Sequence, residues 1–273
     1  MCIELNFNTL HNNSTGLAMK QLNKLVNENS AIIYLSEPID DVFEKAYVET
    51  RIKEERILTD EQVSELPRVS PDNAHHREWQ IREHSAQNVV KYFRKFDCSC
   101  SDWVLDIGCG NGWFSHLLAE NIEANVLAVD INRLELEQAA RVFSRKNLYF
   151  AYLDLFSGVL EPGQFSLIIF NSSFQYFQDP DLVLEQCLPL LAPSGEIHII
   201  DSPFYEQEKI AAAKSRTEAY YQQLETEKMI AFYHHHSRTL IERYNAKIFY
   251  QPSKNKAVQT EICSPFPWIM ITQ

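Results

Sequence analysis

The chain has 273 residues, of which 45% are hydrophobic and 23% charged, a composition typical of an ordinary globular protein. Its 25 Lys and Arg residues stand against 37 Asp and Glu, and the formal charge of -12 disfavours a nucleic acid as partner, because phosphate binding depends on basic side chains. No apolar run approaches 18 residues and the N-terminus lacks signal-peptide features, so we expect a cytosolic protein without a membrane partner.

The sequence pattern of the first hundred residues predicts a helical extension. Residues 40–66 and 75–96 are helix-prone and rich in both charge signs, and the proline-containing segment 67–71 joins them. We therefore expect residues 1–100 to form an N-terminal extension or cap, and residues 101–273 to form the main domain.

From residue 103 onward, apolar runs alternate with amphipathic stretches, which is typical of βαβ units and a parallel sheet. The predicted strands are 103–107, 125–129, 148–153, 165–170, 196–201, 247–250 and 268–272. The predicted helices are 113–121, 132–144, 181–191 and a long helix-prone stretch of about 207–243. The pattern predicts an α/β fold with a Rossmann-like, mostly parallel sheet of seven strands and helices on both faces. We expect residues 203–243 to cap the substrate.

A glycine-rich turn with the sequence DIGCGNG, at residues 106–112, joins the first strand to its helix. Glycines permit a tight turn and a close approach of the backbone to a ligand. Their G-x-G-x-G spacing is shorter than the dinucleotide pattern G-x-G-x-x-G. The helix that follows offers free N–H groups, which can hold the carboxylate of an amino-acid moiety.

Two aspartates follow the next two predicted strands. Asp130 ends the second strand, where a carboxylate can accept hydrogen bonds from both ribose hydroxyls. Asp154 follows the third strand, from which a carboxylate can accept a hydrogen bond from an adenine amino group. Three strand ends thus converge on one nucleoside.

Taken together, residues 104–114, Asp130, Asp154 and residues 165–171 resemble the class I methyltransferases that depend on S-adenosylmethionine (SAM). The resemblance covers about residues 103–202 and extends to uncharacterised bacterial members with small-molecule acceptors. It implies SAM as cofactor and S-adenosylhomocysteine (SAH) as product. The motif N-P-P-[YF] of amino- and nucleobase-methylating enzymes is absent.

The resemblance assigns parts of the cofactor to particular residues. Asp106 and the turn would serve the methionine part, Asp130 the ribose, and Asp154 with the Leu155 amide the adenine. Trp79 and Arg82 are candidate lid residues on the preceding helix, with Arg82 reaching the SAM carboxylate. The predicted cofactor site therefore consists of Trp79, Arg82, Asp106, Gly108, Cys109, Gly110, Gly112, Asp130, Ile131, Asp154, Leu155 and Asn171.

The acceptor side is predicted from the segment after the fourth strand and from aromatic residues of the cap. The aromatic content of these segments suggests a partly apolar small molecule. The candidate substrate residues are Ser172, Ser173, Phe174, Tyr176, Tyr205, Tyr220 and Tyr221.

No acid–base pair stands out, so we expect methyl transfer mainly by proximity and desolvation, with a base only where the acceptor must lose a proton. Candidates for that optional base are His198, Tyr205, His234, His235 and His236. No metal site is expected, because the six cysteines lack C-x-x-C spacing and successive histidines on a helix cannot converge on one ion.

Three alternatives remain open from the sequence. A nicotinamide-dependent oxidoreductase would require G-x-G-x-x-G and a hydride-transfer set, which the chain lacks. A SAM-binding module without catalysis would keep the same aspartates, because binding and turnover use one pocket. An RNA or protein methyltransferase is disfavoured by the acidic balance and the absent N-P-P-[YF] motif.

Overall fold

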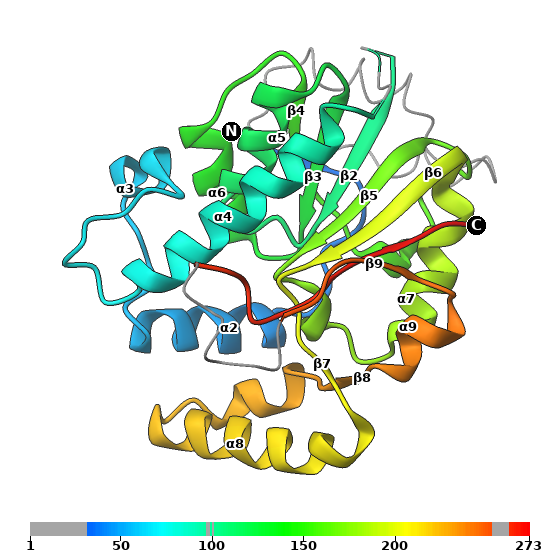
Figure 1. The fold of residues 1–273 in the computed structure, drawn as a ribbon. Coiled ribbons are helices and arrows are strands. Elements are labelled where there is room, and N and C mark those ends of the chain that lie inside the picture. Colours follow the sequence, from blue (N-terminus) through cyan, green and yellow to red (C-terminus); the bar gives the residue numbers. More distant parts are fainter. Residues whose placement is uncertain (1–31, 97–98, 100, 253–261) are drawn as a thin grey trace.

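The computed structural model describes residues 32–96, 99, 101–252 and 262–273, which form an α/β fold around one large sheet (Figure 1). The strand order is β1-β4-β3-β2-β5-β6-β10-β9. The first six strands in this order pair in parallel, whereas β10 is antiparallel to both β6 and β9. The strands are β1 (Ile33–Tyr34), β2 (Trp103–Ile107), β3 (Asn125–Asp130), β4 (Leu148–Tyr152), β5 (Phe165–Asn171), β6 (Leu191–Ile200), β9 (Lys247–Tyr250) and β10 (Trp268–Ile271). The predicted fold class is confirmed.

The predicted count of seven strands is wrong, because the sheet has eight. The additional strand, β1, comes from the segment that we predicted to be a helical extension, and it pairs in parallel with β4. Its two residues are too few to show the alternation by which a strand is recognised in a sequence. The backbone N–H of Leu35 continues the ladder by donating to the Tyr152 carbonyl at 3.0 Å. The chain before the main domain is therefore tied to the sheet edge.

Helices cover both faces of the sheet, as predicted (Figure 1). One apolar core packs α3, α4, α5 and α6 on one face, and a second core packs α7 and α9 on the other. The helices are α2 (Val42–Lys53), α3 (Asp60–Glu65), α4 (His76–Phe93), α5 (Trp113–Asn121), α6 (Arg133–Val142), α7 (Pro180–Cys187), α8 (Ile210–Gln223) and α9 (Thr239–Arg243). None of the helices in the described part of the chain is long and apolar enough to span a bilayer.

Two predicted helices are divided. Residues 40–66 form α2 and α3, because Glu55 adopts a left-handed φ of 57° and Thr59 starts a new helix as its N-cap. Thr59 and Gln62 form a capping box, in which each side chain accepts a hydrogen bond from the other residue's backbone N–H.

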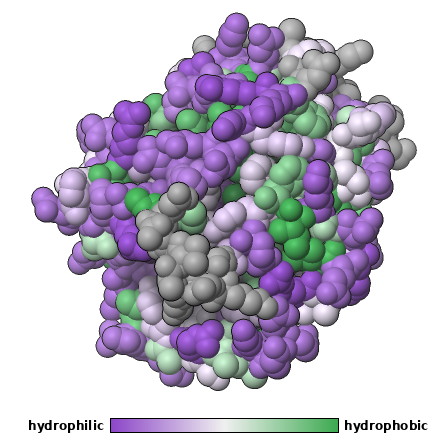
Figure 2. All heavy atoms as spheres, in the orientation of Figure 1, coloured by the Kyte–Doolittle hydropathy of each residue, from purple (hydrophilic) through white to green (hydrophobic). Residues whose placement is uncertain are grey.

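The stretch 207–243 is divided further. It contains the 3-10 turns η5 (Gln207–Lys209) and η6 (Glu227–Phe232), helices α8 and α9, and the strand β8 (His236–Ser237). Glu225, at φ 56°, follows the end of α8, and β8 pairs with β7 (Phe204–Tyr205) in a small second sheet. Hydrophilic residues dominate the molecular face shown in Figure 2, in keeping with the acidic composition.

Candidate functional site

The glycine turn lies at the carboxyl end of β2, pressed between β3 and the segment after β5. Gly108 has φ +74°, and its backbone N–H donates to the Val129 carbonyl at 2.8 Å. A Cβ on Gly108 would lie 2.5 Å from the Cβ of Ser173, which is closer than real Cβ atoms approach. The Ser173 hydroxyl also donates to the Ile107 carbonyl at 2.6 Å, so this segment clamps the turn from one side.

Asp106 lies beneath the turn and is almost completely buried. Its Oδ2 accepts a hydrogen bond from the Ser115 hydroxyl at 2.6 Å, whereas Oδ1 has no partner among the described residues. Burial raises the pKa of this carboxyl to about 7. Asp106 borders neither of the two cavities described below, so its contact with a ligand stays a prediction.

Asp130 ends β3 and is held by backbone groups on both sides. Its Oδ2 accepts from the Gly110 N–H and its Oδ1 from the Asn132 N–H, each at 2.8 Å. Burial raises the pKa of Asp130, although the donating N–H groups oppose this effect. Asp154 is held similarly, because its Oδ1 accepts from the Phe156 N–H at 3.1 Å. Both carboxylates therefore have defined positions at the sheet edge.

A cavity of about 460 Å³ opens between these strand ends and the cap, and we call it the large cavity. Its wall on the cap side is mainly aromatic and includes Phe43, Tyr47 and Phe232. The predicted site residues that line it are Gly108, Gly110, Asp130, Ile131, Asp154, Leu155, Ser172, Ser173 and Tyr176. The structure thus brings the predicted ribose, adenine and acceptor residues into one space.

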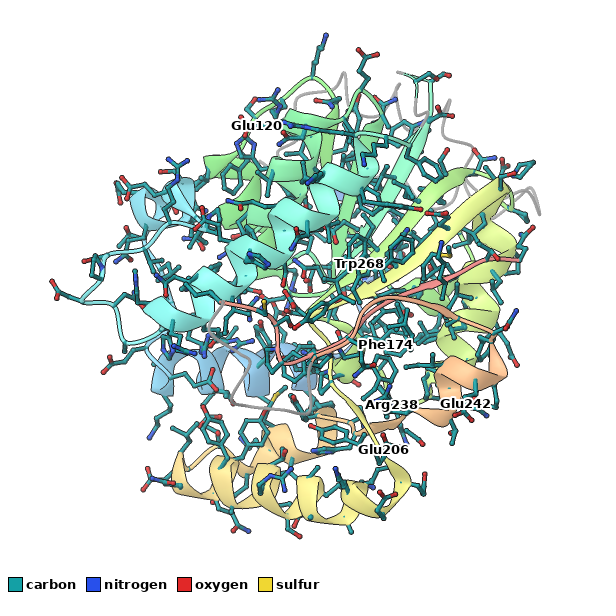
Figure 3. All side chains as sticks on the ribbon, in the orientation of Figure 1. Glu120, Phe174, Glu206, Arg238, Glu242 and Trp268 are labelled. Atoms are coloured by element: carbon teal, nitrogen blue, oxygen red, sulfur yellow. The ribbon has the colours of Figure 1, made fainter. Side chains whose placement is uncertain are left out.

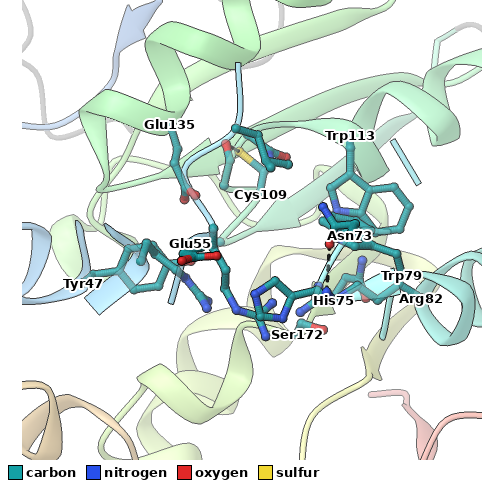
Figure 4. Close-up of a pocket in the computed structure, with 17 residues that line it drawn as sticks. Tyr47, Glu55, Asn73, His75, Trp79, Arg82, Cys109, Trp113, Glu135 and Ser172 are labelled. Atoms are coloured by element: carbon teal, nitrogen blue, oxygen red, sulfur yellow. Dashed lines mark hydrogen bonds between the residues drawn. The ribbon is translucent and has the colours of Figure 1, made fainter. Parts of the chain in front are cut away.

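A second hollow of about 100 Å³ adjoins the glycine turn on its other side, and we call it the polar pocket (Figure 4). It shares Tyr47, Gly108, Gly110, Glu135 and Ser172 with the large cavity, so the two spaces are neighbours. The other predicted site residues that line it are Trp79, Arg82, Cys109 and Asn171.

The residues at the carboxyl ends of the parallel strands fit SAM. A glycine turn, two carboxylates at successive strand ends and a cavity large enough for a nucleoside lie together there. A ligand at this edge lies where open parallel sheets bind nucleotides.

Comparison with known proteins agrees with this geometry. A family model described as "Methyltransferase domain" matches residues 101–259, more than half of the chain. The chain belongs to this methyltransferase family. The predicted class I SAM-dependent family is thereby confirmed, together with SAM as its cofactor, and the nicotinamide-dependent alternative is set aside.

Individual relatives of the methyltransferase domain are more distant. Malonyl-[acyl-carrier protein] O-methyltransferase of Acetivibrio thermocellus is 36% identical over 77 residues, which are 28% of this chain and 27% of that protein. Arsenite methyltransferase of Aquipseudomonas alcaligenes is 32% identical over 130 residues, or 43% and 37% of the two chains. The matched segments therefore span well under half of these relatives' lengths.

The fold of the methyltransferase domain has counterparts among solved structures. Geranyl diphosphate C-methyltransferase from Streptomyces coelicolor A3(2) superposes with a TM-score of 0.52 at 12% identity, covering 83% of this chain and 96% of that one. At this identity the likeness concerns the fold alone.

Several predicted residues of the methyltransferase domain lie outside both cavities. Gly112 is the N-cap residue of α5 and packs beneath the turn. Phe174, labelled in Figure 3, is fully buried, with its ring 5.1 Å from that of Phe170. Tyr220 donates to Glu54 at 2.6 Å on the surface, and Tyr221 packs in a cluster with α2 and η6. Their contact with an acceptor stays a prediction.

The histidine tract is not helical, contrary to our expectation. His236 belongs to β8 and its Nε2 lies 3.1 Å from the Phe174 carbonyl, while the Nε2 of His235 lies 2.9 Å from the Thr217 hydroxyl. Burial lowers the pKa of all three histidines, that of His236 to about 4. Neither the tract nor the nearby Tyr205, whose ring packs on His235, lines the large cavity or the polar pocket. No group of ligands that could hold a metal ion occurs within the described ranges.

His198 lies on β6, away from both cavities and completely buried. Its Nδ1 accepts from the Trp268 indole N–H at 2.9 Å, so its Nε2 carries the proton and donates to Glu196 at 2.9 Å. The donor, Trp268, lies on β10 beside β6 (Figure 3). Burial lowers the pKa of His198 despite the opposing effect of Glu196. This arrangement indicates a role in stability, and the catalytic role that we predicted has no support from its position.

The variant His198→Phe is expected to lower the free energy of unfolding by about 2 kcal/mol at pH 7.5, because the Trp268 indole N–H loses its acceptor and Glu196 keeps only the Tyr92 hydroxyl as donor. The unfolded chain binds the histidine proton more readily than the folded one, so this contribution is complete above the unfolded pKa of about 6.5 and is lost as the pH falls. Urea unfolding at pH 7.5 and 5.5 should show the difference between wild type and variant shrinking. A SAM dissociation constant that changes more than twofold would place His198 in the site after all.

Tyr47, Arg51 and Glu135 line the polar pocket but lie outside the predicted set. Arg51 of α2 donates to the Tyr176 hydroxyl at 3.2 Å and to Glu54 at 2.8 Å, and its guanidinium lies 4.5 Å from the ring centre of Tyr47. Glu135 of α6 borders both cavities. The sequence around Arg51 and Tyr47 indicates only a helix. Glu135 lies three residues after Asn132, a spacing that is typical of a helix cap, so the sequence offers no reason to expect it in a cavity wall.

Proposed function

We propose that this chain transfers the methyl group of SAM to a small, partly apolar acceptor, mainly by positioning the two molecules and excluding water. The observation that carries the proposal is the large cavity, which runs from the carboxylates of Asp130 and Asp154 to an aromatic wall. Curated relatives named for the small acceptors arsenite and demethylmenaquinone support a small molecule over a nucleic acid.

Each wall of the cavity has a distinct task in this proposal. Asp130 accepts from the ribose hydroxyls and Asp154 from the adenine amino group, which orients the cofactor. When bound, SAM supplies an electrophilic methyl group on a sulfonium. Ser172, and Asn171 from the adjoining polar pocket, would face the methyl group, and Tyr176 would border the acceptor. Holding reactants in line can contribute about 7–11 kcal/mol to lowering the barrier, so a strong base is not required.

The cap supports the exclusion of water. The rings of Phe43 and Phe232 lie 5.4 Å apart, and those of Tyr47 and Tyr176 lie 5.6 Å apart, so aromatic residues of α2 and η6 cover the segment after β5. We propose that the substrate cap comprises the N-terminal extension together with about residues 203–243; residues 1–31 of that extension lie outside the described residues. Methyl transfer in such a space avoids competition from water.

The test combines binding with turnover. Titration calorimetry is expected to show SAM and SAH binding, and incubation with SAM and a fractionated extract of small metabolites is expected to yield SAH above the rate without acceptor. Binding without SAH formation from any fraction would favour a catalytically silent SAM-binding module. SAH formation only with added RNA or protein would identify the other class of acceptor.

A further inference from the structure

Glu135 lines both the large cavity and the polar pocket. Figure 4 shows its side chain among the residues of the polar pocket. Glu135 lies in the first turn of α6, where its backbone N–H donates to the Asn132 side chain at 3.3 Å. A Cβ on Gly110 would lie 3.1 Å from Glu135 Oε2, so the carboxyl rests directly against the middle of the glycine turn.

The Glu135 carboxyl has few polar partners in the protein. It receives one long hydrogen bond, 3.4 Å from the Asn132 side-chain amide, and within the described chain it has no ion pair. The nearby Arg51 is paired with Glu54, and Arg82 with Glu78. Burial and the neighbouring Asp130 raise the pKa of Glu135 to about 7, although Arg51 and Arg82 oppose this effect.

The polar pocket carries both signs of charge. Arg51, Arg56 and Arg82 line it together with Glu135. Each arginine also pairs with a carboxylate, since Arg51 and Arg56 contact Glu54, and Arg56 and Arg82 contact Glu78. A pocket of this kind suits a zwitterion, because a carboxylate and an ammonium each find a complementary charge. The methionine half of SAM ends in such a zwitterion.

We propose that Glu135 accepts a hydrogen bond from the α-ammonium of the cofactor's methionine half, while the arginine side of the polar pocket faces the α-carboxylate. The inference rests on the proposed function, because it takes SAM as the ligand. It follows from the place of Glu135 at the turn, where the nucleoside side meets the polar pocket. Glu135 is then a binding residue for the cofactor, beyond the glycine turn and the strand-end aspartates.

The test compares ligands that contain the methionine zwitterion with one that lacks it. Titration calorimetry would measure SAM, SAH and 5′-deoxy-5′-methylthioadenosine, which keeps the nucleoside and the thioether but has no amino acid. Glu135→Gln is expected to weaken SAM and SAH at least ~10-fold, the range for a charge-assisted hydrogen bond, and to leave methylthioadenosine within twofold. The matched control is Glu137→Gln on the exposed side of the same helix, which should change none of the three.

Each other result overturns the inference in a recognisable way. Equal weakening of all three ligands would place Glu135 at the ribose, and weakening of SAM without SAH would place it at the sulfonium. If wild type binds SAM and Glu135→Gln binds it equally well, the inference fails while the proposed function stands. If wild type binds neither SAM nor SAH, the proposed function itself fails. Should the Gln variant not fold, Glu135→Asp, which withdraws the carboxylate by one methylene, is expected to show the same ligand pattern.

Discussion

Replacing Asp130 by Ala is expected to weaken SAM binding about 100-fold. Its carboxylate is placed by two backbone donors, Gly110 N–H and Asn132 N–H, with oxygen lone pairs left for the two ribose hydroxyls. Hydrogen bonds to a charged group contribute about 1.5–3 kcal/mol each, so losing the pair would account for at least this factor. Titration calorimetry with SAM would measure it.

Two further variants serve as comparisons. Asp130→Asn keeps one acceptor oxygen, so only one of the two backbone N–H groups stays paired, and the neutral side chain should lose about tenfold in affinity because a neutral acceptor forms the weaker hydrogen bond. Asp72→Ala, on an exposed loop, should leave both affinity and melting temperature unchanged. An Asp130→Ala protein that binds SAM within threefold of wild type would remove the ribose role from this residue.

Gly112→Ala is expected to reduce the free energy of unfolding by about 3 kcal/mol or more. Gly112 has φ +76°, which costs an alanine about 1–2 kcal/mol. The added Cβ would also lie 2.6 Å from the Phe150 ring and 2.8 Å from the Ala139 Cβ, and overpacking of this kind typically costs a further ~1–3 kcal/mol. Urea unfolding followed by circular dichroism would measure the loss.

Gly158 provides the matched control, because it has φ +70° but a Cβ added there would meet nothing within 4 Å beyond its chain neighbours. Gly158→Ala should therefore show the backbone cost alone, about 1–2 kcal/mol. The contrast between the two glycines isolates the steric contribution beneath the turn. Equal losses in both variants would mean that Phe150 and Ala139 move aside and that the turn tolerates a side chain.

The parallel sheet was predictable because its strands are short, continuous apolar runs separated by amphipathic helices. The turn and the two aspartates were predictable for a related reason, since parallel strands bring their carboxyl ends to one edge. β1 was not predictable, because two residues carry no periodicity and its pairing with β4 depends on contacts with a segment far along the chain.

The cap was the least predictable part of the site. Arg51 and Tyr47 lie on a helix whose sequence shows only mixed charge, and their relation to Tyr176 arises from packing between distant segments. The helical expectation for 207–243 failed because one left-handed residue, Glu225, and a two-residue strand interrupt an otherwise helix-prone composition. The conformation of these segments depends on tertiary contacts more than on local helix propensity.

The paired indoles of Trp79 and Trp113 have a practical consequence. Their rings meet edge to face at 5.6 Å, both border the polar pocket, and the Arg82 guanidinium lies 5.3 Å from the centre of the Trp79 ring. Trp113 is the first residue of α5, directly after the glycine turn. A charged ligand in the polar pocket would change the electric field at both indole rings. Ligand binding can therefore be followed by intrinsic tryptophan fluorescence, without an added label.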